Sequence, residues 1–305
     1  MTVVSSMAVA AVKLNTHLPP GAALAPACSP YLQFAGAGAG AGGVSCAGSA
    51  IDVMAVLDPP PAADGMAPLL SDRTGWALLG DGARRRLRLG SADDATPMRV
   101  VGEWDLDAAS ATAFVAPHAV HAGERGTEID DPVRYPLDQL LLMYHLARRG
   151  GLLVHAAGVT AGGRALIFPG VSGAGKSTLA RHFMAGRWPA LLSDDRIVVR
   201  ELEGRFTAFG TPWPGDAGVA VNDGAPLAGI LFPVRGESSR IDALTPQAAL
   251  DRLLPATSML WHEQELLFGQ LETCERLLRA IPAFELAWSP NSGVTDDVDA
   301  LLRQL

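Results

Sequence analysis

A glycine-rich stretch in the middle of the chain has the residue types and spacing of a phosphate-binding loop. Residues 170–178 read Gly-Val-Ser-Gly-Ala-Gly-Lys-Ser-Thr and fit the pattern G-x-x-x-x-G-K-[ST] without a mismatch. They follow the apolar run Ala-Leu-Ile-Phe at 165–168, as a loop after a buried strand should. In such a loop, backbone N–H groups surround a phosphate, and the next helix points its positive end at the same anion. The pattern therefore predicts a nucleotide site.

The positions of this loop have different expected roles. Lys176 should reach the β- and γ-phosphates of ATP, and the Ser177 hydroxyl should bind Mg²⁺. The chain contains only two lysines, Lys13 and Lys176, so chance matches to a pattern that requires lysine are rare. The alternative is a glycine-rich turn before an ordinary helix. The residues expected to contact the nucleotide are Gly170, Ser172, Gly173, Ala174, Gly175, Lys176, Ser177 and Thr178.

Two adjacent carboxylates follow the loop. Asp194 and Asp195 come eighteen and nineteen residues after Lys176, at the end of the expected strand 189–193. One carboxylate would accept a proton from an attacking hydroxyl and the other would help to hold Mg²⁺, with Asp195 as the metal candidate beside Ser177. Successive strand residues face opposite ways, so both can serve one site only if the strand has ended. The alternative is a solvated turn in which Asp194 caps the next element.

These motifs, in this order, resemble the HPr kinase/phosphorylase family. The matching residues are His155 in Val-His-Ala-Ala-Gly, the loop 170–178 and Ser-Asp-Asp at 193–195, within residues 152–233. The resemblance is to the C-terminal catalytic domain, whose fold is related to the ATP-dependent phosphoenolpyruvate carboxykinases. It implies ATP-dependent transfer to a serine hydroxyl, with catalytic roles for His155, Lys176, Asp194 and Asp195. His155 would lie near the γ-phosphate or the metal; the alternative is a core histidine.

The segment 210–215, Gly-Thr-Pro-Trp-Pro-Gly, also resembles diverse bacterial HPr-kinase-like proteins, some of which are associated with peptide-modification gene clusters. Its prolines and glycines predict a rigid turn that either presents Trp213 to the ligand or buries it as an anchor. Arg196 and Arg235 are candidates to stabilise the transferring phosphoryl group, or surface arginines at strand ends. HPr kinases carry a Gly-Arg-Asn stretch toward the C-terminus, and this chain has no counterpart of it. The first 150 residues also show no likeness to the N-terminal domain of HPr kinases. The resemblance therefore does not identify the acceptor of the phosphoryl group in this protein.

The composition limits the classes of partner. A net charge of −8 and a pI near 5.3 argue against a nucleic-acid surface. Three cysteines without C-x-x-C spacing indicate neither a disulfide framework nor a zinc site. No apolar run approaches the length of a membrane span, so we expect a cytoplasmic protein without a membrane partner. The basic run Arg84–Arg88 is expected to be a solvated strand face, or a patch for an acidic partner.

The pattern of elements predicts two domains. Residues 1–135 form a β-rich module of short strands, with a Gly/Ala-rich loop at 35–43. Residues 136–305 form an α/β P-loop domain with an HPr kinase/carboxykinase-like mixed sheet. It begins with a helix at 136–149, and later segments are expected to form a hairpin around Glu203-Gly204 and helices to Leu254 and at 263–280.

The function expected from these features is a kinase that transfers the γ-phosphate of ATP to a hydroxyl of a small protein, peptide or metabolite. Replacing Asp194 or Asp195 with Ala should spare nucleotide binding and abolish transfer. The alternatives are a non-catalytic nucleotide-binding regulator or scaffold, an ABC-type or motor ATPase, and a carboxykinase-like enzyme. Homo-oligomerisation is left open.

Overall fold

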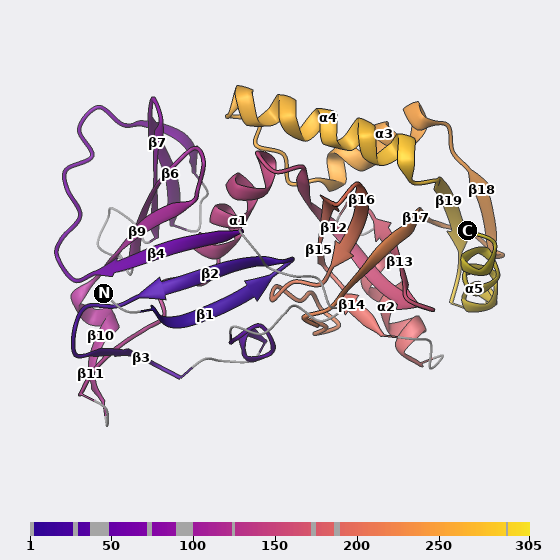
Figure 1. Cartoon of the computed structure of the whole chain (residues 1–305). Coiled ribbons are helices and arrows are strands. Elements are labelled where there is room, and N and C mark those ends of the chain that lie inside the picture. Colours follow the sequence, from indigo (N-terminus) through magenta and orange to yellow (C-terminus); the bar gives the residue numbers. More distant parts are fainter. Residues whose placement is uncertain are drawn as a thin grey trace. The chain divides into compact units, whose positions relative to one another are not determined.

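A computed structural model describes residues 3–26, 30–36, 49–71, 75–89, 100–123, 126–171, 175–185, 190–290 and 292–305. The fold is mixed α/β, with several sheets and few helices (Figure 1). The chain divides into two compact units, one drawn mainly from residues 1–145 and the other mainly from residues 146–305. The β-rich N-terminal region and the mixed α/β class agree with the sequence-based expectation.

The N-terminal unit is built on an eight-stranded sheet of order β1-β2-β4-β9-β8-β7-β6-β5, with a second sheet of order β10-β11-β3. Burial alternates along β2 and β4, which is typical of strands with one packed face. Helix α1 (Leu137–Ala147) packs closely on β8, because a Cβ at Gly102 would lie 2.5 Å from Leu137 Cδ1. The strands are β1 (Val3–Val9), β2 (Val12–His17), β3 (Ala22–Leu24), β4 (Ala50–Val56), β5 (Ala67–Ser71), β6 (Trp76–Asp81), β7 (Arg84–Leu89), β8 (Val100–Asp105), β9 (Ser110–Val115), β10 (Val120–Gly123) and β11 (Gly126–Ile129). Short 3-10 helices lie at Tyr31–Gln33 and Pro117–Ala119.

Two of the four arginines of β7 differ from the expected solvated face, whereas Arg84 is exposed as expected. Arg85 and Arg86 are buried. Arg86 forms an ion pair with Glu103 on the neighbouring strand, and its guanidinium also donates to the Pro61 carbonyl oxygen at 2.9 Å. These partners let a charged side chain be buried in this sheet.

The C-terminal unit has a mixed sheet of order β13-β12-β15-β16-β17-β19-β18, with β14 also paired to β12. Because β13 pairs with β17 as well as with β12, the five strands β13, β12, β15, β16 and β17 form a closed ring. The β13–β17 and β17–β19 pairs are parallel, and the others are antiparallel. The strands are β12 (Gly151–Ala161), β13 (Arg164–Pro169), β14 (Leu191–Ser193), β15 (Arg196–Leu202), β16 (Arg205–Phe209), β17 (Gly224–Arg235), β18 (Arg240–Ala243) and β19 (Ala283–Trp288).

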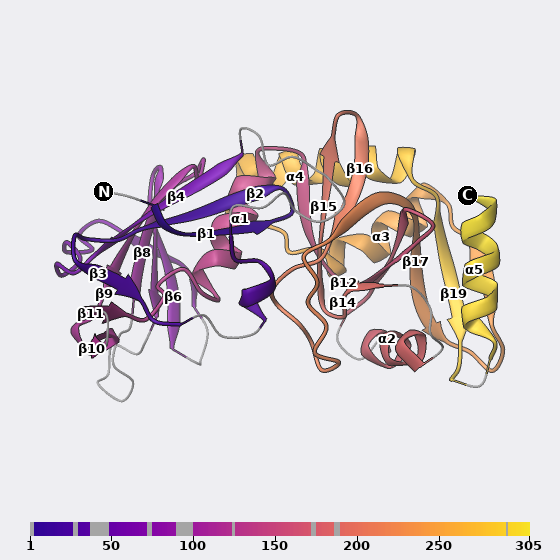
Figure 2. The same cartoon turned by 60° about the horizontal axis from the view of Figure 1, so that its bottom comes forward.

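Two cores lie on opposite sides of the strands. One contains Leu253 and Leu277 of helices α3 (Pro246–Ala256) and α4 (Gln264–Ala280), packed with Ile167 of β13. The other contains residues of α2 (Lys176–Ala185) and α5 (Val294–Gln304), packed with Phe168 of β13. Because Ile167 and Phe168 are neighbours in one strand, they face opposite sides, and so do the helix pairs (Figure 2).

Several expected elements are confirmed. The helix expected at 136–149 is α1, and the helices expected to Leu254 and at 263–280 are α3 and α4. The hairpin β15–β16 turns at Glu203 (φ 51°) and Gly204 (φ 75°), two successive left-handed residues as its two-residue turn requires. Most of the Gly/Ala-rich segment 35–43 lies outside the described residues, and the domain boundary at 135/136 stays a prediction. No helix in the described part of the chain combines the length and apolar character that a bilayer crossing requires.

Candidate functional site

A cavity of about 480 Å³ lies at the start of α2 in the C-terminal unit. Its volume is within the range of small-molecule sites, roughly 300–1,000 Å³. Its walls carry more positive than negative side chains, which suits an anionic ligand. The lining residues are His155, Gly175, Lys176, Ser177, Thr178, Arg181, Asp195, Arg196, Gly215, Asp216 and Arg235.

The described part of the glycine-rich loop leads directly into α2. Gly175 has φ 89°, which favours glycine, and its carbonyl oxygen accepts the first helical bond from Leu179 N at 2.9 Å. Lys176 is buried, and its Nζ donates to the Val171 carbonyl oxygen at 3.1 Å. Burial lowers the pKa of Lys176 below its usual value, and the charge of Arg196 acts in the same direction, whereas Asp195 opposes both. Ser172, Gly173 and Ala174 lie outside the described residues.

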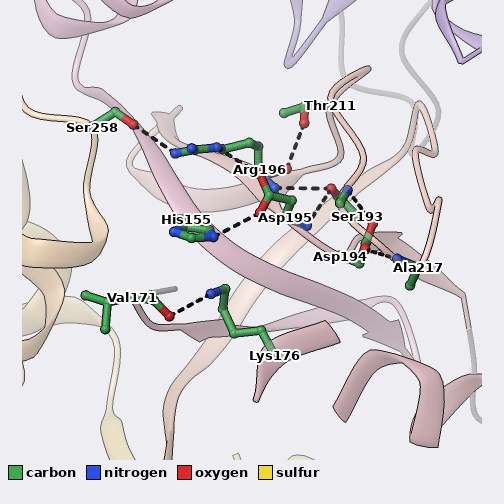
Figure 3. A network of polar contacts seen from close by, with 11 residues as sticks. His155, Val171, Lys176, Ser193, Asp194, Asp195, Arg196, Thr211, Ala217 and Ser258 are labelled. Atoms are coloured by element: carbon green, nitrogen blue, oxygen red, sulfur yellow. Dashed lines mark hydrogen bonds and ion pairs between the residues drawn. The ribbon is translucent and has the colours of Figure 1, made fainter. Parts of the chain in front are cut away.

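Asp195 is held by the side chains of His155 and Arg196 (Figure 3). Its Oδ1 lies 2.9 Å from His155 Nε2, and its Oδ2 accepts from Arg196 Nε at 3.0 Å. Burial by itself would raise the pKa of Asp195. The hydrogen bond from His155 and the charges of Arg196, His155 and Lys176 outweigh burial, so the pKa is lower than usual. Asp195 is therefore ionised at neutral pH, beside the lysine of the loop.

Strand β12 connects Asp195 to the loop. His155 pairs in register with Arg196, and Ala156 N donates to the Asp195 carbonyl oxygen at 2.9 Å. On the other side of β12, Gly170 N donates to the His155 carbonyl oxygen at 3.1 Å. The structure thus brings His155, the beginning of the loop and Asp195 together.

Asp194 has different surroundings from those expected. Its side chain is fully buried and does not line the cavity. Its carboxylate accepts three backbone hydrogen bonds, from Gly215 N at 2.9 Å, Ala217 N at 2.7 Å and Val219 N at 3.1 Å. The two aspartates were expected to share one site. β14 does end before them, at Ser193, yet in the bend that follows the carboxylate of Asp194 faces the backbone amides of residues 215–219 and Asp195 faces the cavity.

The segment 210–215 packs closely on the end of β14 and on the two aspartates that follow it. A Cβ at Gly210 would lie 2.0 Å from the Val221 carbonyl oxygen, so only glycine fits. Trp213 is 7% exposed and is absent from the cavity lining. Of the two roles considered for Trp213, this agrees with a buried anchor and not with a side chain presented to the ligand. Arg196 and Arg235 do line the cavity, as candidates for phosphoryl stabilisation should.

A family model described as "ScmC: SynChlorMet cassette protein ScmC" matches residues 137–291, which is slightly more than half of the chain. The chain belongs to the ScmC family. The match includes every lining residue of the cavity. No curated protein matches the chain.

Two lining residues of this ScmC-family site were missed in the sequence analysis, Arg181 and Asp216. Arg181 could have been found, because it follows Ser177 by four residues and therefore lies on the same face of the helix. Asp216 directly follows the segment 210–215, but no spacing rule relates it to the loop. Only the fold brings it to the cavity.

The candidate Mg²⁺ ligands Ser177 and Asp195 both line the cavity. Within the described ranges, no group of three or more His, Cys, Asp or Glu side chains is arranged to hold a metal ion. A magnesium ion bound with a nucleotide commonly takes one or two protein groups and completes its shell with phosphate oxygens and water. One hydroxyl and one carboxylate fit that donor set.

Proposed function

We propose that this protein is an ATP-dependent phosphotransferase of the HPr-kinase-like type, which transfers the γ-phosphate to a hydroxyl, with serine as the favoured acceptor. The observation that carries this proposal is that Asp195 lines one cavity with Lys176 and Ser177. Phosphoryl transfer asks a protein mainly to position its reactants and to neutralise charge. The charged side chains that line this cavity would supply both.

The phosphate end of the site would consist of the loop and the beginning of α2. Lys176 and the N-terminus of α2 would attract the β- and γ-phosphates. Arg181 and Arg235 add positive charge to the same cavity. Mg²⁺, when bound, would neutralise phosphate charge, with Ser177 and Asp195 as its candidate protein ligands.

The acceptor end would be at Asp195. An acceptor hydroxyl hydrogen-bonded to this carboxylate would attack the γ-phosphorus, the bond from phosphorus to the ADP oxygen would break, and the hydroxyl proton would pass to Asp195. Each oxygen of Asp195 already accepts one bond and retains a second lone pair for the acceptor or the metal. His155 and Arg196 would keep the carboxylate oriented and ionised.

Two variants test this division of labour. In Lys176→Ala, Mg²⁺-ATP binding measured by calorimetry should weaken at least about tenfold, because the buried cation is lost. In Asp195→Asn, ATP binding should remain within a few-fold of wild type, and labelling of a serine-peptide array by γ-³²P-ATP should disappear. Asp242→Asn changes an exposed carboxylate outside the cavity and is the matched control. Undiminished labelling by Asp195→Asn would contradict the proposal.

A nucleotide-binding regulator is the second candidate. It is favoured by one observation, namely that both oxygens of Asp195 are already paired, one with His155 and the other with Arg196. If those pairs persist when nucleotide is bound, the carboxylate is less able to accept a proton. Tight ATP binding by the wild type, without ADP formation and without any labelled peptide, would support the regulator.

A further inference from the structure

Residues 210–221, called here the wall segment, contribute Gly215 and Asp216 to the lining of the cavity and run alongside the end of β14. This wall segment is joined to β14 by a bond from Val221 N to the Leu192 carbonyl oxygen at 2.9 Å and by a bridge between Ser193 and Ala220. Thr211 Oγ1 donates to the Arg196 carbonyl oxygen at 2.8 Å. The wall segment is thus attached to the strand end that carries the two aspartates.

The central attachment is the carboxylate of Asp194. Its Oδ1 accepts from Gly215 N and Val219 N, and its Oδ2 accepts from Ala217 N, at 2.7–3.1 Å (Figure 3 shows the bond to Ala217). A buried carboxylate is stable only with such partners, and hydrogen bonds to an ionised acceptor are stronger than neutral ones. One side chain therefore fixes three alternate amides of the wall segment.

Close packing completes the attachment. A Cβ at Gly215 would lie 2.8 Å from Asp194 Oδ2 and 3.0 Å from Asp195 Cβ. Any larger residue would push the wall segment away from the aspartates. On its other side, Arg181 Nη2 of α2 donates to the Asp216 carbonyl oxygen at 3.1 Å. The two wall residues that face the cavity, Gly215 and Asp216, are therefore held from both sides.

We propose that Asp194 is a positioning residue, which holds the wall segment in place against the phosphate cavity before any ligand binds. Asp195 is then the only member of the aspartate pair that meets the ligand. A wall fixed in advance needs no further ordering when the nucleotide enters, and this lowers the entropic cost of binding. The proposal rests on the proposed function for the identity of the ligand, but not for the attachment itself.

Amide hydrogen exchange of the free protein tests the attachment without any activity assay. In Asp194→Asn, an NH₂ group replaces one acceptor oxygen and the negative charge is lost. Exchange in peptides covering residues 212–221 should become about tenfold faster or more. Peptides from α4 should keep wild-type exchange, which shows that the variant is folded, and Asp242→Asn should match wild type throughout. Wild-type exchange of the wall segment in Asp194→Asn would overturn the proposal.

Nucleotide binding tests the positioning role. Asp194→Asn and Gly215→Ala should each weaken Mg²⁺-ATP binding about tenfold, and the double variant should bind no more weakly than either, because both release the same wall. Fully additive losses would overturn the proposal. So would an Asp194→Asn variant that binds ATP normally and only loses transfer, since Asp194 would then act on the reaction itself.

Nucleotide added to the wild type tests whether the wall is preformed. Exchange in residues 212–221 should change less than about threefold, because these amides are already bonded. A larger slowing would mean that the ligand orders the wall, against the proposal. If the wild type binds no nucleotide, the proposed function fails, whereas the exchange of the free Asp194→Asn variant still decides whether Asp194 holds the wall.

Discussion

Neighbouring residues of the same type have different roles in this protein. Asp194 and Asp195 are chemically identical, yet one accepts three backbone amides and the other pairs with His155 and Arg196. Both residues lie in the bend after β14, and there the side chain of Asp194 points into the protein and that of Asp195 into the cavity. At the residue scale, the surroundings and not the residue type determine the chemistry.

Asp195 gives a pH-dependent prediction. Its pKa is lower in the folded protein than in the unfolded chain, so its ionised form stabilises the fold above about pH 4, and this contribution is lost as the pH falls through the folded value. Arg196→Gln removes one of the charges that lower the pKa. The pKa of Asp195 should therefore rise toward its unfolded value, and the stability that is lost on acidification should become smaller.

A carboxyl ¹³C titration of wild type and Arg196→Gln measures this shift. Arg235→Gln is the matched control, because Arg235 lines the same cavity but is not among the groups that perturb Asp195. An unchanged titration in Arg196→Gln would contradict the assigned cause.

Cys274 gives a second prediction at this scale. Its thiol is fully buried in α4, and burial raises its pKa to about 12. Since only the thiolate reacts with alkylating agents, the reactive fraction should be about a thousandfold lower than for an ordinary cysteine. At pH 8, mass spectrometry should find the Cys274 peptide unlabelled by iodoacetamide in the native protein and labelled in urea. Rapid labelling of the native protein would show that α4 opens readily.

At the scale of elements, β12 organises the C-terminal unit. It pairs with β13, β14 and β15, and so connects the strand before the loop with the strands on both sides of the aspartates. Its residues enter both cores, Val154 on the α3 and α4 side and Val159 on the α2 and α5 side. A cavity bounded by β12 is therefore supported by both hydrophobic cores.

The start of α3 offers a test of local stability. Thr245 caps this helix by accepting from Ala248 N at 3.3 Å, and Pro246 occupies the first helical turn. Thr245→Ala should lower the free energy of unfolding by about 1 kcal/mol, measured with urea, because an amide loses its partner. Thr245→Ser retains the hydroxyl and should stay close to wild type. Equal losses in both variants would mean that the threonine methyl group, and not the cap, is important.

At the scale of the whole molecule, every lining residue of the cavity belongs to the C-terminal unit. Under the proposed function, Mg²⁺-ATP should therefore stabilise that unit specifically. At a ligand concentration of 100 times Kd, the expected stabilisation is about 2.7 kcal/mol.

Calorimetric melting with and without Mg²⁺-ATP measures this effect. The chain's two lysines provide the variant and its control. Lys176→Ala should lose the shift, whereas Lys13→Ala, in the N-terminal unit, should retain it. A shift retained in Lys176→Ala would mean that nucleotide binds elsewhere.

Much of the C-terminal unit could be predicted from the sequence because its signals are local. The helices α3 and α4 follow from periodicity, prolines and caps, as does α1 at the end of the N-terminal unit, and the β15–β16 hairpin follows from one turn dipeptide. The burial of Arg86 in β7 could not be predicted in this way, because its partners Glu103 and Pro61 lie 17 and 25 residues away in the chain.

The sequence by itself determined the phosphate-loop pattern and the placing of Lys176 and Ser177 at the start of a helix, because the strand, the loop and the helix are contiguous in the chain. It also indicated that an acid would follow at the end of a nearby strand. Only the tertiary structure decided which acid faces the cavity, that Asp216 and Arg181 join it, and that Trp213 is buried. Those outcomes depend on how the ring of strands closes and on which side of a strand end each side chain points, and neither is encoded in local spacing.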